Sequence, residues 1–374
     1  KNKMRKKIIF FHPYSVYGGA DLSISKLIDA TPIGYEIDFL TFSKNPKIRF
    51  YTKRKINILK IKKINFVFSI FKLRKLLKKK LRAFDKVILL SNQNFANILA
   101  LISSFNLKKV KNISFERNHI SELDHSDEWT TSSKNIIIKF LIKIFYRYSD
   151  ILLGNSEELC KDLEKYCGKK VLKLHNFYKF NDLKKKSNLK KIKKVKFKKN
   201  IIINVGRLVN QKNQIFLLKS FKILNKKNKK INLLLIGDGN KKKNLQNFII
   251  KNKLNNNVQI LSGIKNSLPY VSNSDLYVST SKYEGFPNII IESLTLNVPI
   301  ISMHYKSGLS EILLNGKGGD IIRNKNPSEL AKKILFFFRK KDFLMKKTIL
   351  SRKKLKRFDY ETGRKKFQKI INNL

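Results

Sequence analysis

Residues 200–214 have the sequence NIIINVGRLVNQKNQ. The apolar run up to Val205 is typical of a strand buried on both faces of a parallel sheet, and Gly206 ends it. Arg207 and Lys212 follow in the loop and in the first turn of the next helix. A glycine lets the backbone approach a ligand closely, and two cations beside a helix N-terminus suit a diphosphate. In a chain with 82 basic residues, an ordinary surface loop remains the alternative on spacing alone.

The alternation of strands and helices continues through the second half of the chain. Short apolar runs alternate with runs of helical spacing, as in a doubly wound α/β domain. The expected strands are Asn200–Val205, Ile231–Ile236, Val258–Leu261, Leu276–Ser279 and Pro299–Ser302. The expected helices are Gln214–Leu224, Lys241–Leu254, Ser267–Ser272 and Asn288–Leu296.

The first half begins with the same kind of unit. A strand, Ile8–Phe11, precedes a loop with Gly18 and Gly19, and helical spacing follows over Ala20–Ile28. Further strand-like runs are Glu36–Phe42, Ile56–Ile61, Lys86–Ser91 and Asn112–Phe115. The first half is therefore predicted to be a second α/β domain. Two such domains facing each other make a cleft, with ligands beyond the carboxyl ends of the strands.

A lysine-rich segment near the middle of the chain is the best candidate for a linker. It holds ten lysines in sixteen residues and few apolar ones. The predicted organisation is an N-terminal domain over 1–183, a linker over 184–199, a C-terminal domain over 200–350, and a C-terminal helix over 351–374 that is a candidate for crossing back to the first domain.

Two carboxylates stand out, because the chain has only 26 acidic residues. Glu284 lies in the loop after the strand Leu276–Ser279, and Glu292 lies about one turn inside the helix that starts near Pro287. A carboxylate can accept hydrogen bonds from sugar hydroxyls, and the N–H groups of a helix start can hold phosphate. The alternative is an exposed loop glutamate and a glutamate that stabilises the helix dipole.

The net charge of 82 − 26 = +56 has two interpretations. It fits a nucleic acid or an anionic membrane as partner, or it reflects compositional drift, which we favour because the lysines are spread along the chain. A hydrophobic content of 42% and 27 phenylalanines exclude a disordered basic tail.

Cysteine and histidine spacing narrows the chemistry. Cys160 and Cys167 form neither a disulfide framework nor a usual zinc spacing, and they indicate a reducing compartment. The sequence has no histidine–cysteine cluster, so no protein-bound metal is expected. It also lacks the glycine-rich loop of P-loop ATPases and the nucleophile elbow of α/β-hydrolases.

Two segments, Val67–Phe84 and Ile136–Tyr148, are candidate basic amphipathic helices. They could dock on an anionic membrane surface, or each could be an ordinary helix with a solvated face. No apolar stretch reaches about 18 uncharged residues, so no transmembrane span is predicted. The basic start of the chain leads into a buried strand and not into the pattern of a signal peptide.

These motifs together resemble the retaining family 4 glycosyltransferases of GT-B architecture, also described as glycosyl transferases group 1. In the second half the resemblance rests on Asn204–Leu208, Gln211–Asn213, Ile236–Gly239, Ser281–Pro287, Glu292–Leu294, Val298–Ile301, Glu311–Ile312 and Asn326–Ala331. In the first half it is looser and rests on Gly18–Asp21, Gly154–Leu159 and His175–Phe177. The resemblance implies two Rossmann-like domains around a central cleft.

The resemblance also implies roles for individual residues. Arg207 and Lys212 would bind the donor diphosphate, and Glu292 would hold the ribose. Glu284, with Gly285, Phe286, Pro287 and Asn288, would hold the transferred sugar and the α-phosphate region. Gly18 and Gly19 would let the first-domain loop approach donor and acceptor, and Gly263 and Ile264 would line the base. The family needs no metal cofactor, because arginine and lysine stabilise the leaving group.

The first domain departs from the family pattern at one position. Relatives often carry a histidine there after a strand, near the reacting sugar. His119 follows the strand Asn112–Phe115 and is the favoured candidate. Arg117 is the alternative, and the remaining interpretation is that His119 is an ordinary surface histidine.

The function implied by the resemblance is a hexosyltransferase that uses a nucleotide-diphosphate sugar, with a UDP-sugar favoured, and retains the anomeric configuration. The acceptor would be a glycan or lipid-linked glycan in the synthesis of a cell-envelope polysaccharide or lipopolysaccharide. The expected location is the cytoplasm, or the cytoplasmic face of the membrane as a peripheral protein. The alternatives are a basic nucleic-acid-binding protein, which lacks a supporting motif, and an inactive glycosyltransferase-like binding module.

Overall fold

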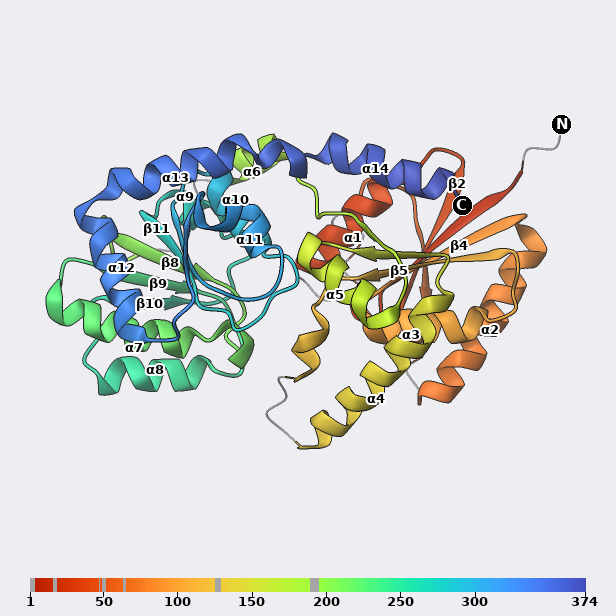
Figure 1. Ribbon diagram of the computed structural model, residues 1–374, viewed down its shortest axis with the longest axis horizontal. Helices are drawn as coiled ribbons and strands as arrows, with labels where there is room; N and C mark the ends of the chain where they lie inside the picture. Colours follow the sequence, from red (N-terminus) through yellow and green to blue (C-terminus); the bar gives the residue numbers. More distant parts are fainter. Residues whose placement is uncertain are drawn as a thin grey trace. The chain divides into compact units, whose positions relative to one another are not determined.

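The computed structural model describes residues 4–15, 19–46, 48, 52–62, 65–124, 129–188 and 195–374. The chain forms two compact units (Figure 1). Unit 1 consists of residues 1–177 and 360–374, and unit 2 consists of residues 178–359. The sequence placed the boundary at 183, whereas the structure places it between Phe177 and Tyr178, before the helix α6 (Phe180–Ser187). The first four residues of the predicted linker thus belong to a helix of unit 2, and residues 189–194 lie outside the described part.

Unit 1 is built on a seven-stranded sheet with the order β3-β2-β1-β4-β5-β6-β7, in which every pair is parallel. The strands are β1 (Lys6–Phe11), β2 (Tyr35–Thr41), β3 (Asn57–Lys60), β4 (Lys86–Asn92), β5 (Val110–Glu116), β6 (Ile151–Gly154) and β7 (Val171–Lys173). The strand β1 is an interior strand of this sheet, and its residues Ile8–Phe11 are buried on both faces, which explains the apolar sequence of this part of the strand.

Helices cover both faces of this sheet. On one face, α1 and α14 pack on the side chains of Ile8 and Phe10, and on the other face α2 and α3 pack on Ile9 and Phe11. The helices of unit 1 are α1 (Gly19–Ala30), α2 (Phe66–Ala83), α3 (Asn94–Ser104), α4 (Trp129–Phe145), α5 (Glu157–Cys167) and α14 (Tyr360–Asn372).

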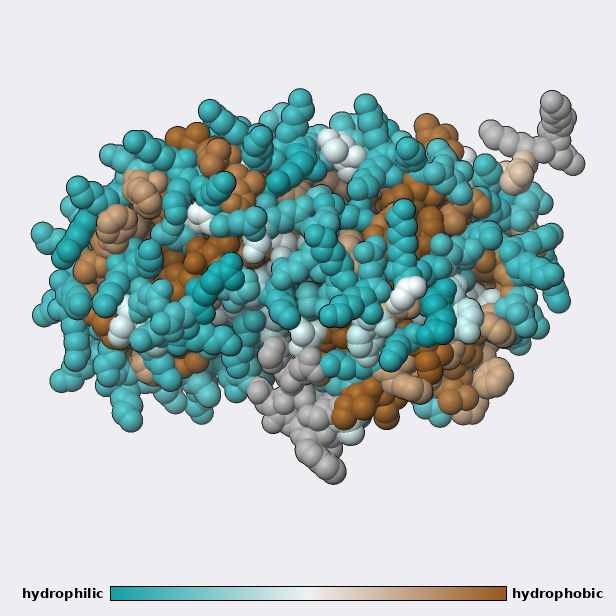
Figure 2. Space-filling view, in the orientation of Figure 1, coloured by the Kyte–Doolittle hydropathy of each residue, from teal (hydrophilic) through white to brown (hydrophobic). Residues whose placement is uncertain are grey.

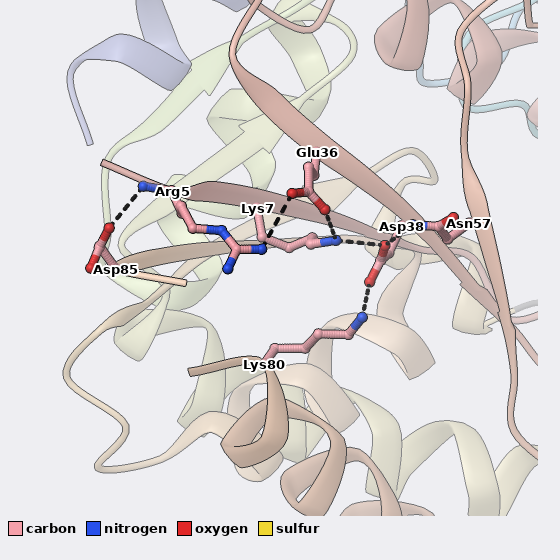
Figure 3. A network of polar contacts seen from close by, with 7 residues as sticks. All are labelled: Arg5, Lys7, Glu36, Asp38, Asn57, Lys80 and Asp85. Atoms are coloured by element: carbon pink, nitrogen blue, oxygen red, sulfur yellow. Dashed lines mark hydrogen bonds and ion pairs between the residues drawn. The ribbon is translucent and has the colours of Figure 1, made fainter. Parts of the chain in front are cut away.

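A buried ion network fastens the end of α2 to the sheet (Figure 3). The Lys7 ammonium lies 3.0 Å from Oδ1 of Asp38, and Lys80 Nζ of α2 lies 2.7 Å from its other oxygen. Lys7 and Asp38 are almost fully buried, and Asn57 also donates to the carboxylate. Since a buried charge is stable only when it is paired and hydrogen-bonded, these lysines have a structural role and are not part of a general surface excess.

Unit 2 has a six-stranded parallel sheet with the order β10-β9-β8-β11-β12-β13. Its strands are β8 (Ile201–Val205), β9 (Asn232–Ile236), β10 (Val258–Leu261), β11 (Leu276–Ser279), β12 (Ile300–Met303) and β13 (Asp320–Ile322). Its helices are α6, α7 (Gln214–Lys227), α8 (Lys242–Lys251), α9 (Leu268–Ser272), α10 (Asn288–Thr295), α11 (Leu309–Ile312), α12 (Pro327–Arg339) and α13 (Lys341–Lys353).

Both sheet faces of unit 2 carry an apolar core. The helices α7, α8 and α12 pack on one face, and α9, α10 and α11 pack on the other. The order is that of a doubly wound fold, so the predicted pair of Rossmann-like units is confirmed. Among the helices that the structure describes, none is both long enough and apolar enough to cross a lipid bilayer.

Candidate functional site

The carboxyl end of β8 leads into a loop that is packed closely against the loop after β9. Gly206 donates its N–H to Ile236 O, and Leu208 donates to Asp238 O at 2.8 Å. A Cβ atom added at Gly237 would lie 1.9 Å from Gly206 O, so only glycine fits there. This packing presents Arg207 at the sheet edge, where its side chain is exposed and its Nη2 lies 3.3 Å from Gln211 Oε1.

Lys212 ends the short 3₁₀ turn Asn210–Lys212 and points to Glu284. Its ammonium forms an ion pair with Glu284 Oε1, which also accepts a 2.7 Å hydrogen bond from Ser281. Both side chains are only partly exposed, at 19% for Lys212 and 13% for Glu284. The pair joins two loops that are 72 residues apart in sequence, so a cation and a carboxylate meet at the same sheet edge.

The loop that carries Glu284 is held in place on both sides. Gln211 donates to Tyr283 O at 3.1 Å, and its own carbonyl accepts from the Lys282 N–H at 2.8 Å. Phe286 and Pro287 are buried, and α10 begins at the next residue, Asn288. The predicted loop and helix start therefore lie beside Lys212.

The electrostatic influence of the site reaches the buried tyrosines beneath it. Burial raises the pKa of Tyr277 strongly, and the charges of Glu284 and Glu292 raise it further. Glu292 lies one turn inside α10, as predicted, and is half-buried. Two carboxylates thus act on the same core position at the carboxyl end of the unit 2 sheet.

Gly263 and Ile264 follow β10. The N–H of Gly263 donates to the Asp238 carboxylate at 2.8 Å, and Ile264 packs against the apolar core of α9 and α10. In the sequence, Asp238 was named only within the stretch Ile236–Gly239, and the structure gives its side chain a role in joining two loops.

In unit 1, Arg117 and His119 lie at the carboxyl end of β5, and both are buried. The Arg117 guanidinium donates to Asn92 Oδ1 at 3.1 Å and to Asn176 Oδ1 at 2.9 Å. The His119 ring points elsewhere, with Nδ1 at 2.9 Å from Ser121 Oγ and 3.3 Å from Asp162 Oδ2. The two candidates for one site position therefore have separate surroundings.

His12 is a buried group that the sequence did not single out. It directly follows β1, and the register of β1 with β4 continues to place it beside Asn92. Burial, and to a smaller extent the nearby charge of Arg117, lower its pKa to about 3. The imidazole is therefore neutral at physiological pH. Its position straight after a buried strand was the only available signal.

A carboxylate with the opposite tendency lies on the other face of the same sheet. Burial raises the pKa of Glu116, and hydrogen bonds from Tyr146 and from two backbone N–H groups partly offset this rise. The Tyr146 hydroxyl donates to Glu116 Oε2 at 2.6 Å and accepts from Asn97 at 3.0 Å.

Of the two glycines predicted to lie near the donor, Gly19 is the first residue of α1, the helix that follows β1. Gly18 lies outside the described residues.

Comparison with known proteins identifies one family. The glycosyl transferases group 1 family matches residues 185–357. An uncharacterized glycosyltransferase of Methanocaldococcus jannaschii is 32% identical over 302 residues, which cover 78% of this chain and 73% of the relative. An α-1,4-N-acetyl-D-galactosaminyltransferase of Campylobacter jejuni, named for a glycan acceptor on diphospho-undecaprenol, is 22% identical over 95% of both chains.

Solved structures give the same architecture. HepE of Anabaena, in complex with UDP-glucose, superposes with a TM-score of 0.79 at 17% identity, over 98% of this chain and 100% of that one. The two units are those of the GT-B fold.

Proposed function

This chain belongs to the glycosyl transferases group 1 family and is a nucleotide-sugar-dependent glycosyltransferase, and we propose that it transfers a hexosyl unit from a UDP-sugar, with retention, to a glycan or lipid-linked glycan of a cell-envelope polysaccharide. The Campylobacter relative, named for an acceptor on diphospho-undecaprenol, supports this class of acceptor. The Anabaena structure with UDP-glucose supports the choice of donor.

The ion pair between Lys212 and Glu284 is the observation that carries the proposal. An ammonium has three donors, so Lys212 can keep Glu284 and still donate to a phosphate oxygen. Arg207, exposed two residues after β8, adds a guanidinium that can hold phosphate in a bidentate manner. Together they would stabilise the negative charge that develops on the leaving diphosphate.

The carboxylates would orient the sugars. Glu284 is held by Lys212 and Ser281, and its carboxylate oxygens can accept hydrogen bonds from hydroxyls of the transferred sugar. Glu292, one turn inside α10, would accept from the ribose hydroxyls. The backbone of residues 285–288 would bring the start of α10 to the α-phosphate, and Gly263 and Ile264 would line the base.

His119 is the residue of unit 1 that we propose lies near the reacting sugar. Asp162 and Ser121 lie on its Nδ1 side and orient the ring, which is what a histidine near a reacting sugar needs. Arg117, engaged by two asparagines, would act as support for that edge.

The proposed chemistry is a displacement with retention. The acceptor hydroxyl attacks the anomeric carbon on the face from which UDP departs, and a leaving phosphate oxygen takes the hydroxyl proton. The new glycosidic bond forms as the bond to the diphosphate breaks, so no carboxylate is a covalent nucleophile. The positive charge comes from Arg207 and Lys212 and not from a metal, and we therefore expect UDP release to persist in EDTA.

The protein is proposed to act at the surface of a membrane. On α2, Val67, Phe68 and Phe71 are exposed by 55–64%, and on α4 Ile136, Ile137 and Phe140 are exposed by 58–68%. Figure 2 shows hydrophobic residues exposed over the segments that Figure 1 labels α2, α3 and α4. Exposed apolar side chains of this size among cations fit an anionic lipid surface better than they fit nucleic acid.

The charge of these helices supports that partner. Neither α2 nor α4 has an acidic residue, and five basic residues of α2 are exposed on the same side as its phenylalanines: Lys72, Lys75, Lys78, Lys79 and Arg82. We expect flotation with anionic liposomes at about 0.15 M salt, and weaker flotation of a Phe68→Ser, Phe71→Ser double variant. Absence of lipid binding by the wild-type chain would overturn this part of the proposal.

Two substitutions test the donor site. We expect Lys212→Ala to lower UDP release in a transfer assay by about 100- to 1000-fold, and Glu292→Ala to weaken donor binding. Lys219→Ala, an exposed lysine on α7, is the matched control and should behave as the wild type. Unchanged UDP release by the Lys212 variant would show that the donor site is elsewhere.

A further inference from the structure

The chain passes between the units twice, and the two crossings are paired. One crossing lies between Phe177 and Tyr178, and the other lies between Asp359 and Tyr360. Tyr178 forms a parallel bridge with Asp359, and its N–H donates to Phe358 O at 2.8 Å. The first and last residues of unit 2 therefore form one local structure, although 180 residues separate them along the chain.

This paired crossing touches the loop of residues 284–288, called the donor loop here. The Tyr178 hydroxyl donates to Asn288 Oδ1, at the first residue of α10. The Phe358 ring packs edge-on against Phe286, with the ring centroids 5.6 Å apart. Each of the two crossings thus supplies one aromatic side chain to the donor loop.

The crossing is firmly held on both sides. Tyr178 is 1% exposed and Phe358 is fully buried. On the side of unit 1, a Cβ atom added at Gly363 would lie 2.2 Å from Phe177 Cδ1, so α14 is packed tightly on the residue before the crossing. Close-packed interiors transmit small shifts. A displacement at the crossing would therefore also displace the donor loop.

We propose that Tyr178 is a positioning residue for the donor, which fixes the Asn288 amide and the start of α10 and links them to the crossing. The inference rests on the proposed function, because it assumes that the donor loop binds a UDP-sugar. Because Tyr178 is 1% exposed, it would act through Asn288 and not by contacting the donor itself.

The Tyr178 hydroxyl determines which way the Asn288 amide is oriented. An asparagine side chain accepts through oxygen and donates through nitrogen, and the Tyr178 O–H donates to the oxygen. The nitrogen is then the atom that can donate to an anionic ligand such as a phosphate. Without the hydroxyl the amide can rotate by 180° and present its oxygen, which repels phosphate.

The proposed coupling between the crossing and the donor loop is reciprocal. If the crossing affects the affinity for the donor, thermodynamic reciprocity requires the donor to affect the crossing by the same factor. We therefore expect UDP to slow hydrogen exchange of the Tyr178 N–H in the wild-type chain, and to slow it less in Tyr178→Phe.

The decisive experiment is titration of UDP into the full chain and its variants. We expect Tyr178→Phe to raise the Kd for UDP about three- to tenfold, with a similar rise of the donor KM and a kcat within about twofold of the wild type. Phe358→Leu keeps an apolar side chain at this buried position, and it should also raise the Kd for UDP. Tyr166→Phe, in unit 1, removes a partly buried hydroxyl that donates to Lys139 O, and it is the control for the substitution.

A double variant tests whether Tyr178 acts through Asn288. Tyr178→Phe combined with Asn288→Ala should bind UDP no more weakly than Asn288→Ala alone. Additive losses, or a Kd for Tyr178→Phe within twofold of the wild type, would overturn the inference. If the wild-type chain itself failed to bind UDP, the proposed donor would be wrong, and this outcome is distinct from the other two.

Discussion

Arg117 and Arg207 lie within two residues of the carboxyl end of a parallel strand, one in each unit, and their surroundings are opposite. Arg117 follows β5, is buried, and donates to Asn92 and Asn176. Arg207 follows β8, is exposed, and has a long contact with Gln211. The same place in the same kind of sheet thus holds one arginine that supports the protein and one that is accessible to a ligand.

The difference teaches how a strand end becomes a binding site. In unit 1, the amides of Asn92 and Asn176 accept hydrogen bonds from the guanidinium, and burial makes such partners necessary for the charge. In unit 2, tightly packed glycines hold the loop so that the cations lie at its surface. Stability should therefore respond to Arg117 and activity to Arg207.

The largest expected effect is a loss of stability on replacing Arg117. If this loss were absent, the contrast between a supporting Arg117 and an accessible Arg207 would be wrong. Arg117→Ala removes two hydrogen bonds to a charged group and leaves two buried amides unsatisfied, so it should lower the free energy of unfolding by about 3 kcal/mol. Urea unfolding measures this loss. Arg117→Lys should recover only part of it, because lysine lacks the fork. A stable Arg117→Ala protein without transferase activity would instead place Arg117 at the reacting sugar.

The next effect concerns His12 beside Arg117. The folded-state pKa of about 3 lies below the usual 6.5, so the unfolded chain binds more protons between these values. Stability is then complete above pH 6.5 and falls as the pH drops, by about 2 kcal/mol at pH 5. In His12→Gln, the difference in unfolding free energy between pH 7.5 and pH 5 should shrink by this amount. An unchanged difference would mean that His12 is not held neutral.

The smallest effect sharpens the role of unit 2. Arg207→Lys keeps the charge but loses bidentate geometry, so we expect about a tenfold loss in kcat/KM for the donor, or about 1.4 kcal/mol. Its unfolding free energy should stay within about 0.5 kcal/mol of the wild type. A large loss of stability would show that the Arg207 side chain supports the fold, as Arg117 does.

Much of the fold follows from local sequence pattern. The strands β8 to β12 of unit 2 were predicted to within a residue, because each is a short apolar run buried within the sheet and bounded by polar residues, whereas the short strand β13 was not predicted. In unit 1, β6 and the short β7 were not predicted as strands, and Ile151–Gly154 follows an apolar stretch that begins in α4. Apolar runs of this kind do not distinguish a buried strand from a helix.

The site was predictable only in part. Lys212, Glu284 and Glu292 lie in motifs on which the family resemblance rests, and the structure brings Lys212 and Glu284 into contact. Their functional roles remain a prediction. Asn92 was not identified, and Asn176 was named only within the segment His175–Phe177, because a lone asparagine has no pattern that indicates a buried partner.

The sequence by itself determined two parallel α/β units and the positions of the cations and carboxylates along the chain, because burial on both faces of a strand leaves a local apolar signature. Only the tertiary structure decided which arginine is buried, and that Tyr178 pairs with Asn288 across 110 residues. Such contacts depend on how elements distant in sequence pack together, and local spacing carries no information about that geometry.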